Sequence, residues 1–138
     1  MTDKPLLGKT AFISGSGRNI GRAVAVQLAG LGCNVVVNGA TSRADCEATA
    51  ALVEQAGASA SIAMGDMADA DAVADIVKST LDRFGGVDIL INNAAIRPHK
   101  PFLENSDEDW HRVLDTGLTA AFLTSRAFLP HMVEQGWG

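Results

Sequence analysis

The sequence has no apolar stretch that approaches the roughly 20 residues of a membrane-spanning helix. Its start, MTDKPLLGKT, also lacks the long apolar segment of a secretory signal. Positive charge is scarce as well, because the formal net charge is −5 and the basic residues are scattered. A nucleic-acid-binding surface needs a cluster of basic residues. We therefore expect a cytoplasmic protein that binds neither membrane nor nucleic acid.

Patterns typical of disulfides, metal sites and catalytic triads are absent too. Cys33 and Cys46 fall in different expected elements and form no CxxC pair. His99, His111 and His131 have no spacing that indicates a metal site or a triad. We expect two buried free thiols and no bound metal.

The chain has the size and composition of one globular unit. It has 138 residues, 47% of them hydrophobic, which is enough to bury a core. It shows no internal repeat, low-complexity tract or interdomain linker. We expect a single domain over residues 1–138.

Short apolar runs alternate with segments of helical period, which is typical of parallel βαβ units. Four runs rich in Val, Ile or Ala are expected to be strands: 10–14, 33–38, 60–64 and 87–92. In the first expected helix, Ile20, Val24, Leu28 and Leu31 are spaced to share one face. An Ala-rich segment, 42–57, is expected to form the second helix.

The later helices carry signals for their ends. Asp69 can cap the start of the third helix, and Gly85 can end it. Ser106 and Asp109 form a pattern like a capping box, so the fourth helix should begin after Ser106. Pro130 should kink or end that helix.

A right-handed, doubly wound sheet places the four strands in the order 3-2-1-4, with a topological switch beside strand 1. The segment SGSGRNIG, residues 14–21, falls at that switch, where ligands bind in such sheets. Gly15 and Gly17 permit a close approach of the backbone, and the following helix N-terminus attracts a pyrophosphate. Gly21 lets the helix pack closely on the strand. A nucleotide loop is therefore favoured over the alternative, an ordinary glycine-rich turn.

The spacing of these glycines, G-x-G-x-x-x-G, lacks the G-K-[ST] ending of a P-loop and disfavours a nucleotide triphosphatase. It resembles the loop of the short-chain dehydrogenase/reductase family, T-G-x-x-x-G-[IL]-G. The matching residues are Ser14, Gly15, Ile20 and Gly21. Asn19 replaces the family's middle glycine, and asparagine tolerates positive φ well. The resemblance implies a three-layer, Rossmann-like α/β fold.

Two further motifs extend this resemblance over essentially the whole chain. The segment GDM is similar to the family's aspartate motif at the adenine ring, and NNAA is similar to the family's N-N-A-G. Together with the glycine loop and the end of strand 2, they give the residues that we expect at the cofactor: Gly15, Ser16, Gly17, Arg18, Asn19, Ile20, Gly21, Asn38, Thr41, Arg43, Asp66, Met67, Asn93, Ala94 and Ala95.

The end of strand 2 bears on the choice between the two nicotinamide dinucleotides. A fold that selects NAD places an Asp or Glu there, whereas this strand ends in Asn38. Thr41, Ser42 and Arg43 follow as donors, and Arg18 lies in the glycine loop, as in similar NADP-preferring family members. Since both arginines can also be solvated surface residues, NADP is favoured and NAD stays open.

The resemblance implies hydride transfer between the nicotinamide and a carbonyl or hydroxyl group, assisted by tyrosine, lysine, serine and asparagine. The sequence contains no tyrosine, and Gly117 stands where the family has its asparagine. The chain also ends before the expected fifth strand, so we expect no catalytic residue and little activity from these residues alone. Two functions stay open: the cofactor-binding part of an NADP-dependent oxidoreductase whose later strands are lacking, and a noncatalytic nucleotide-binding or interaction module.

The fourth helical segment, 106–135, is apolar over a wide arc. The family that the chain resembles pairs this helix across a subunit interface. We therefore expect a homo-oligomer, or a chain that is only marginally folded in isolation. The small-molecule substrate is not predicted.

Overall fold

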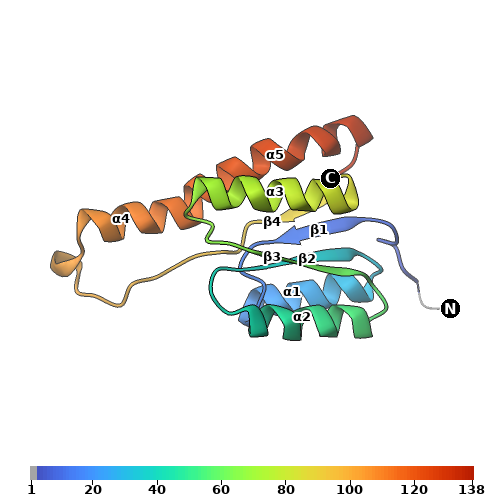
Figure 1. Cartoon of the computed structure of the whole chain (residues 1–138), viewed down its shortest axis with the longest axis horizontal. Helices are drawn as coiled ribbons and strands as arrows, with labels where there is room; N and C mark the ends of the chain where they lie inside the picture. The colour runs from blue at the N-terminus through green and yellow to red at the C-terminus, as the bar shows by residue number, and fades with distance from the viewer. Residues whose placement is uncertain (1–2) are drawn as a thin grey trace.

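A parallel four-stranded sheet lies between two layers of helices in the computed structural model, which describes residues 3–138 (Figure 1). The strands are β1 (Thr10–Ile13), β2 (Asn34–Gly39), β3 (Ala60–Met64) and β4 (Ile89–Ile91). Their order is β3-β2-β1-β4, and every neighbouring pair is parallel. The predicted doubly wound α/β fold and strand order are confirmed.

The helices are divided between the two faces of the sheet (Figure 1). One layer holds α1 (Asn19–Gly30) and α2 (Arg43–Gln55), and the other holds α3 (Ala70–Phe84) and α5 (Ala120–Gln135). Between β4 and α5 lie a 3-10 turn (Phe102–Glu104), α4 (Asp107–Leu114) and a π-helical turn (Asp115–Thr119). Figure 1 shows that α4 extends past the edge of the sheet to which β1 points.

Successive residues of β1 and β2 face opposite layers, so the sheet is buried on both sides. Phe12 and Val36 belong to the core beneath α3 and α5, where the rings of Phe12 and Phe128 are 5.4 Å apart. Ile13 and Val35 belong to the core beneath α1 and α2. Burial on both faces explains why the middle residues of these strands are apolar in an unbroken run.

The face that α1 buries differs from the one predicted. Val24 and Leu28 pack against the core as expected, but Ile20 is 73% exposed and Leu31 is 42% exposed. The fully buried positions are small residues: Gly21, Ala25 and Ala29. Small side chains let this helix lie close to the sheet, and that close contact decides which face is buried.

The predicted signals at the later helix ends are confirmed. The Asp69 side chain accepts hydrogen bonds from the first turn of α3, and Gly85 ends that helix with φ of +77°. Ser106 and Asp109 form a complete capping box at the start of α4. These short-range signals depend on only a few neighbouring residues, so they survive in the folded chain.

Of the two effects expected of Pro130, a kink or an end of the helix, the end is wrong. The helix α5 continues through Pro130 and ends at Gly136, with φ of +65°. The irregularity lies earlier, in the π-helical turn that separates α4 from α5. Phe128 and Met132, on either side of Pro130, both pack into the core, and this packing offsets the hydrogen bond that a proline cannot donate.

Cys33 and Cys46 are both buried free thiols, as expected. Within residues 3–138, no helix is both long and apolar enough to cross a membrane. The same part of the chain holds no group of three or more His, Cys, Asp or Glu side chains arranged for a metal ion.

Candidate functional site

The glycine loop joins the end of β1 to the start of α1. Gly15 has φ of +63° and Asn19 has φ of +51°, both in the left-handed region. Asn19 is the single non-glycine residue with positive φ in the described chain. The expectation that asparagine takes the place of a glycine at a left-handed position is confirmed.

Gly21 is the glycine with the least space around it. A Cβ atom at this position would collide with the Gly15 carbonyl oxygen and would lie 2.7 Å from both Ser16 Cα and Asn93 Nδ2. Backbone atoms cannot move aside as a flexible side chain does. The first turn of α1 therefore rests directly on the loop, which is the close packing that the sequence predicted.

Asn93, which follows β4, fixes the first half of the loop. Its Nδ2 donates to the carbonyl oxygens of Ser14 and Gly15, both at 3.0 Å. The Ser14 hydroxyl accepts the backbone N–H groups of Asn93 at 3.0 Å and Ala94 at 2.9 Å. These four bonds hold the ends of β1 and β4 together at the point where the direction of strand order reverses.

Asn38, at the end of β2, uses its side chain in the same way. Its Oδ1 accepts the Gly15 N–H at 3.0 Å, and its Nδ2 donates to two carbonyl groups at the end of β3, at 2.9 and 3.3 Å. The Ser16 hydroxyl donates to a β1 carbonyl and accepts the Asn38 N–H at 3.0 Å. The side chains of Asn38 and Ser16 thus hold the loop against the end of β2.

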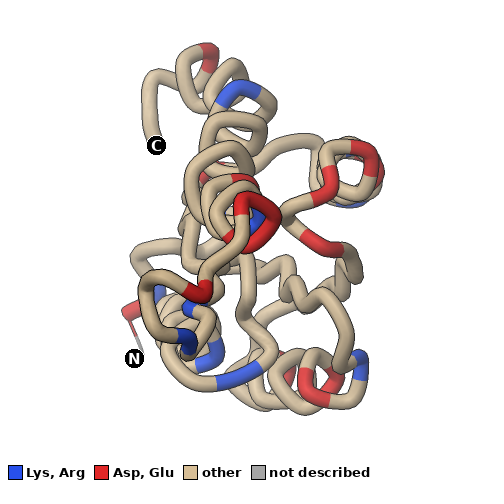
Figure 2. The backbone as a smooth tube through the Cα atoms, turned by 90° about the vertical axis from the view of Figure 1, so that its left-hand side faces the viewer, with Lys and Arg blue, Asp and Glu red and all other residues tan. Residues whose placement is uncertain are grey.

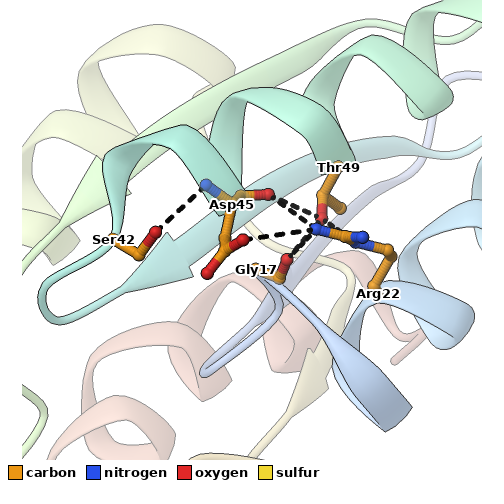
Figure 3. A network of polar contacts seen from close by, with 5 residues as sticks. All are labelled: Gly17, Arg22, Ser42, Asp45 and Thr49. Atoms are coloured by element: carbon orange, nitrogen blue, oxygen red, sulfur yellow. Dashed lines mark hydrogen bonds and ion pairs between the residues drawn. The ribbon is translucent and has the colours of Figure 1, made fainter.

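Arg22 of α1 ties the loop to α2 (Figure 3). Its Nε donates to the Thr49 hydroxyl at 2.9 Å, and its Nη2 donates to the carbonyl oxygens of Gly17 and Asp45. The Asp45 carboxylate is 4.0 Å from the same Nη2. Ser42 caps α2 by accepting the Asp45 N–H at 3.3 Å. One guanidinium group therefore sets the distance between the loop and the start of α2.

A cavity of about 400 Å³ opens at the carboxyl ends of the strands. It is lined by the following residues: Gly15, Gly17, Arg18, Asn19, Ile20, Gly21, Asn38, Gly39, Ala40, Thr41, Ser42, Asp45, Cys46, Gly65, Asp66, Met67, Asn93, Ala94, Ala95, Ile96, Arg112 and Thr116. The structure thus brings all of the predicted site residues to one cavity except Ser16 and Arg43. Figure 2 shows that acidic and basic residues are interspersed on this side of the molecule.

The two exceptions have clear reasons. Ser16 is fully buried because its hydroxyl is bonded beneath the loop. Arg43 is exposed at the start of α2, where its guanidinium group is 3.8 Å from the Glu47 carboxylate one turn along. Arg18, by contrast, is exposed and lines the cavity.

Asp66 and Arg112 face one another across the far end of this cavity. Arg112 Nη2 donates to Asp66 Oδ2 at 3.0 Å, and the Ala68 N–H donates to Asp66 Oδ1 at 2.9 Å. The Ala68 N–H, followed by Arg112, holds the pKa of the Asp66 carboxyl below its ordinary value. Asp66 is therefore an anion at neutral pH, fixed at both oxygens.

A family model described as short chain dehydrogenase matches residues 9–138. The chain belongs to this family. A 3-oxoacyl-[acyl-carrier-protein] reductase of Synechocystis sp. is 38% identical over 133 residues, which are 96% of this chain and 54% of that protein. The reductase FabG of Staphylococcus aureus is 35% identical over 130 residues, which are 94% of this chain and 53% of that protein. The chain thus spans about half the length of the curated relatives that it matches.

Solved structures of short-chain dehydrogenases share the fold. A metagenomic short-chain oxidoreductase in complex with NADP superimposes with a TM-score of 0.90 at 30% identity, covering 96% of this chain and 60% of that one. A double mutant of a Serratia marcescens short-chain dehydrogenase/reductase gives 0.87 at 35% identity, with 92% and 52% covered.

The described residues that line the cavity include no tyrosine, lysine or histidine. Its one thiol, Cys46, is buried, and this burial raises the pKa and keeps the sulfur protonated. Gly117 is exposed in the π-helical turn, and a Cβ there would meet no atom within 4 Å. The arrangement supplies hydrogen-bond donors, two carboxylates and a shaped surface.

Sequence reasoning missed several residues of the cavity wall. Cys46 lies under the loop, where a Cβ on Gly17 would be 3.2 Å from its sulfur. Arg112 and Thr116 come from the segment beyond β4. The capping box located the start of α4, but no local pattern indicates that its last turn brings Arg112 to Asp66. Only the path of the chain after β4 brings these residues to the cavity.

Proposed function

We propose that this chain is the cofactor-binding part of an NADP-dependent short-chain dehydrogenase/reductase, which transfers a hydride between the nicotinamide and a carbonyl or hydroxyl substrate. The observation that carries the proposal is the cavity at the carboxyl ends of the strands, bounded by the glycine loop and the start of α1. In this proposal residues 1–138 form one dinucleotide-binding domain that is incomplete relative to the family.

The roles of the cavity residues follow from their chemistry. The loop from Gly15 to Gly21 offers backbone N–H groups and the N-terminus of α1 to a pyrophosphate. We assign Asp66 and the Met67 backbone to the adenine ring, and the segment 93–95 forms the wall beside β4. The bound dinucleotide supplies or accepts the hydride, while this chain binds and orients it.

NADP is favoured over NAD by the charges around the end of β2. No carboxylate directly follows β2, because Asn38 is followed by Gly39 and Ala40, and the carboxylate of Asp45 further along lies 4.0 Å from the Arg22 guanidinium group. Arg18 and the hydroxyl groups of Thr41 and Ser42 line this part of the cavity, as a 2′-phosphate requires. Arg43 does not line the cavity and its exposed guanidinium group is 3.8 Å from the Glu47 carboxylate, so we assign this preference to Arg18.

We also propose that the chain forms a homo-oligomer through the segment 106–135. Its apolar residues include several large exposed side chains: Trp110 at 62%, Leu118 at 67%, Phe122 at 58%, Leu129 at 48% and Val133 at 78%. On α5, the last three of these recur at helical spacing and leave an apolar stripe open to solvent. Sedimentation should show a dimer or larger species, and Phe122→Glu should convert it to monomer.

One observation favours a second function, a noncatalytic nucleotide-binding module. Gly117 occupies the position of the family's asparagine, and nothing in its surroundings requires a glycine there. A module that only binds a nucleotide has no use for the asparagine. Both functions share the cofactor site, so binding must be tested first.

The experiment is thermal melting of the purified chain with NADPH, with NADH and with neither. A ligand that binds only the folded state raises the melting temperature, and at a hundred times Kd it contributes about 2.7 kcal/mol. We expect a larger rise with NADPH than with NADH. Arg18→Gln should remove this difference, whereas the matched control Arg43→Gln should keep it.

Each other outcome overturns a stated part of the proposal. Equal rises with both ligands overturn the preference for NADP but keep the site. The absence of any rise, on a chain that melts cooperatively, overturns nucleotide binding itself.

A further inference from the structure

Arg112 reaches the cavity from an element that otherwise lies off the sheet. It sits in the last turn of α4, 46 positions along the chain from Asp66, yet Arg112 Nη2 is 3.0 Å from Asp66 Oδ2. Thr116, one turn later, also lines the cavity and donates its hydroxyl to the Arg112 carbonyl at 2.8 Å. The ion pair therefore links the α4 segment to the end of β3 at the cavity wall.

The bonds to Asp66 fix the plane of its carboxylate. Oδ1 accepts the Ala68 N–H at 2.9 Å from within its own turn, and Oδ2 accepts Arg112 Nη2 at 3.0 Å from α4. A carboxylate offers about four lone-pair directions, so each oxygen keeps one for a ligand. The side chain of Asp66 is 36% exposed, which leaves room for that ligand.

We infer that Arg112 is a positioning residue: by holding Asp66 Oδ2 it aims the Asp66 carboxylate at the exocyclic amino group of the adenine ring and so sets selectivity for the base. This inference rests on the proposed function. The adenine amino group donates hydrogen bonds, and a carboxylate held in a fixed orientation accepts one of them. Replacing the amino group with a carbonyl oxygen, as in hypoxanthine, turns the contact into a repulsive one.

If the Arg112–Asp66 ion pair has only a structural role, a different result is expected. Exposed ion pairs contribute little to stability, because water screens the charges and two long side chains lose freedom. Loss of such a pair would weaken NADPH and its hypoxanthine analogue by the same factor. The ratio of the two dissociation constants therefore separates a positioning role from a structural one.

The test is a fluorescence titration of the wild-type chain with NADPH and with reduced nicotinamide hypoxanthine dinucleotide phosphate. We expect the wild type to prefer NADPH by about tenfold, the ratio that about 1.4 kcal/mol gives. Arg112→Gln should lower this preference to about two- or threefold. Arg112→Lys keeps the charge and one donor, so it should retain most of the preference. Arg83→Gln, on α3 with its guanidinium group over the Phe84 ring, is the matched loss of an exposed arginine.

The preference is the ratio of two dissociation constants measured on the same protein. If only part of the Arg112→Gln sample is folded, both constants change by the same factor and the ratio is unaffected. If that variant does not fold at all, Arg112→Lys still tests the inference, since its preference should lie below the wild-type value and above threefold. Wild-type preference in both variants overturns the inference, as does a wild type that binds both dinucleotides equally. A wild type that binds neither overturns the proposed function, and that failure is visible before any variant is made.

Discussion

Asn93 and Ser14 are joined by two hydrogen bonds, one from the Asn93 N–H to Ser14 Oγ and one from Asn93 Nδ2 to the Ser14 carbonyl, both of 3.0 Å. The same Nδ2 also holds the Gly15 carbonyl. The residue after β4 thus determines where the glycine loop leaves β1. The shape of the loop depends on a side chain nearly 80 positions away, as these bonds span 78 and 79 positions.

We expect Asn93→Ala to lower the free energy of unfolding by about 1–3 kcal/mol, because it leaves partly buried carbonyl groups without donors. Urea denaturation measures the change. Asn105→Ala is the matched control, since the Asn105 amide is exposed and bonds only to carbonyls of its own turn. Its effect should stay within about 0.5 kcal/mol. Equal effects of the two variants would contradict a special role for Asn93.

Two glycines give opposite predictions for the same substitution. Gly21→Ala places a methyl group against the Gly15 carbonyl and 2.7 Å from Ser16 Cα, so it should destabilise the chain by about 1–3 kcal/mol. Gly117→Ala meets no atom within 4 Å and replaces a helical glycine, so it should be neutral or stabilising by up to about 1 kcal/mol. Melting temperatures measured side by side check both. A stable Gly21→Ala chain would show that the loop is not packed against α1.

The strand order and the glycine loop could be predicted from the sequence because they depend on strong local signals and one topological rule. Apolar runs located the strands, right-handed crossovers set their order, and Asn19 was expected to adopt positive φ. Asp66 and Asn93 were placed at the site because each directly follows a strand. Parallel strands bring all such positions to one edge.

The features that the sequence did not predict depend on contacts between distant segments of the chain. The buried face of α1 is set by how closely Gly21 and Ala25 let the helix approach, which hydrophobic periodicity does not reveal. Pro130 stays inside α5 because packing outweighs a lost hydrogen bond. Arg43 was expected at the cofactor, but it does not line the cavity and its exposed guanidinium group pairs with Glu47. Arg112 was missed because the path of α4 is a tertiary property.

The capping box of α4 should resist acid. The hydrogen bond from Lys100, followed by the Ser106 N–H, lowers the pKa of Asp109 to about 2 from an ordinary value of 3.8. A depressed folded-state pKa contributes stability that is present above the ordinary value and is lost as pH falls toward 2. We expect Asp109 to remain ionised at pH 3, as an NMR titration of its carboxyl group would show. Lys100→Met should move the midpoint toward 3.8, whereas Lys78→Met, which affects a separate pair on α3, should leave it unchanged.

Arg22 and Arg43 flank the same loop but should differ in importance. The guanidinium group of Arg22 donates to the Gly17 and Asp45 carbonyls and to Thr49 (Figure 3). Arg22→Met removes three charge-assisted hydrogen bonds, while the Thr49 hydroxyl still donates to the Gly17 and Asp45 carbonyls, so it should lower the free energy of unfolding by about 1–3 kcal/mol. Arg43→Met removes only an exposed pair with Glu47 and should change it by less than about 0.5 kcal/mol.

The dependence on salt concentration distinguishes hydrogen bonds to neutral oxygens from ion pairs with carboxylates. Most of the partners of Arg22 are neutral oxygens, so its contribution should persist in 1 M KCl, where the Debye length is about 3 Å and exposed ion pairs are screened. Urea denaturation of both variants at low and high salt is the measurement. If high salt abolished the effect of Arg22→Met, the interaction with the Asp45 carboxylate would dominate. In that case the loop would be held by charge, and the hydrogen bonds to Gly17 and Thr49 would contribute little.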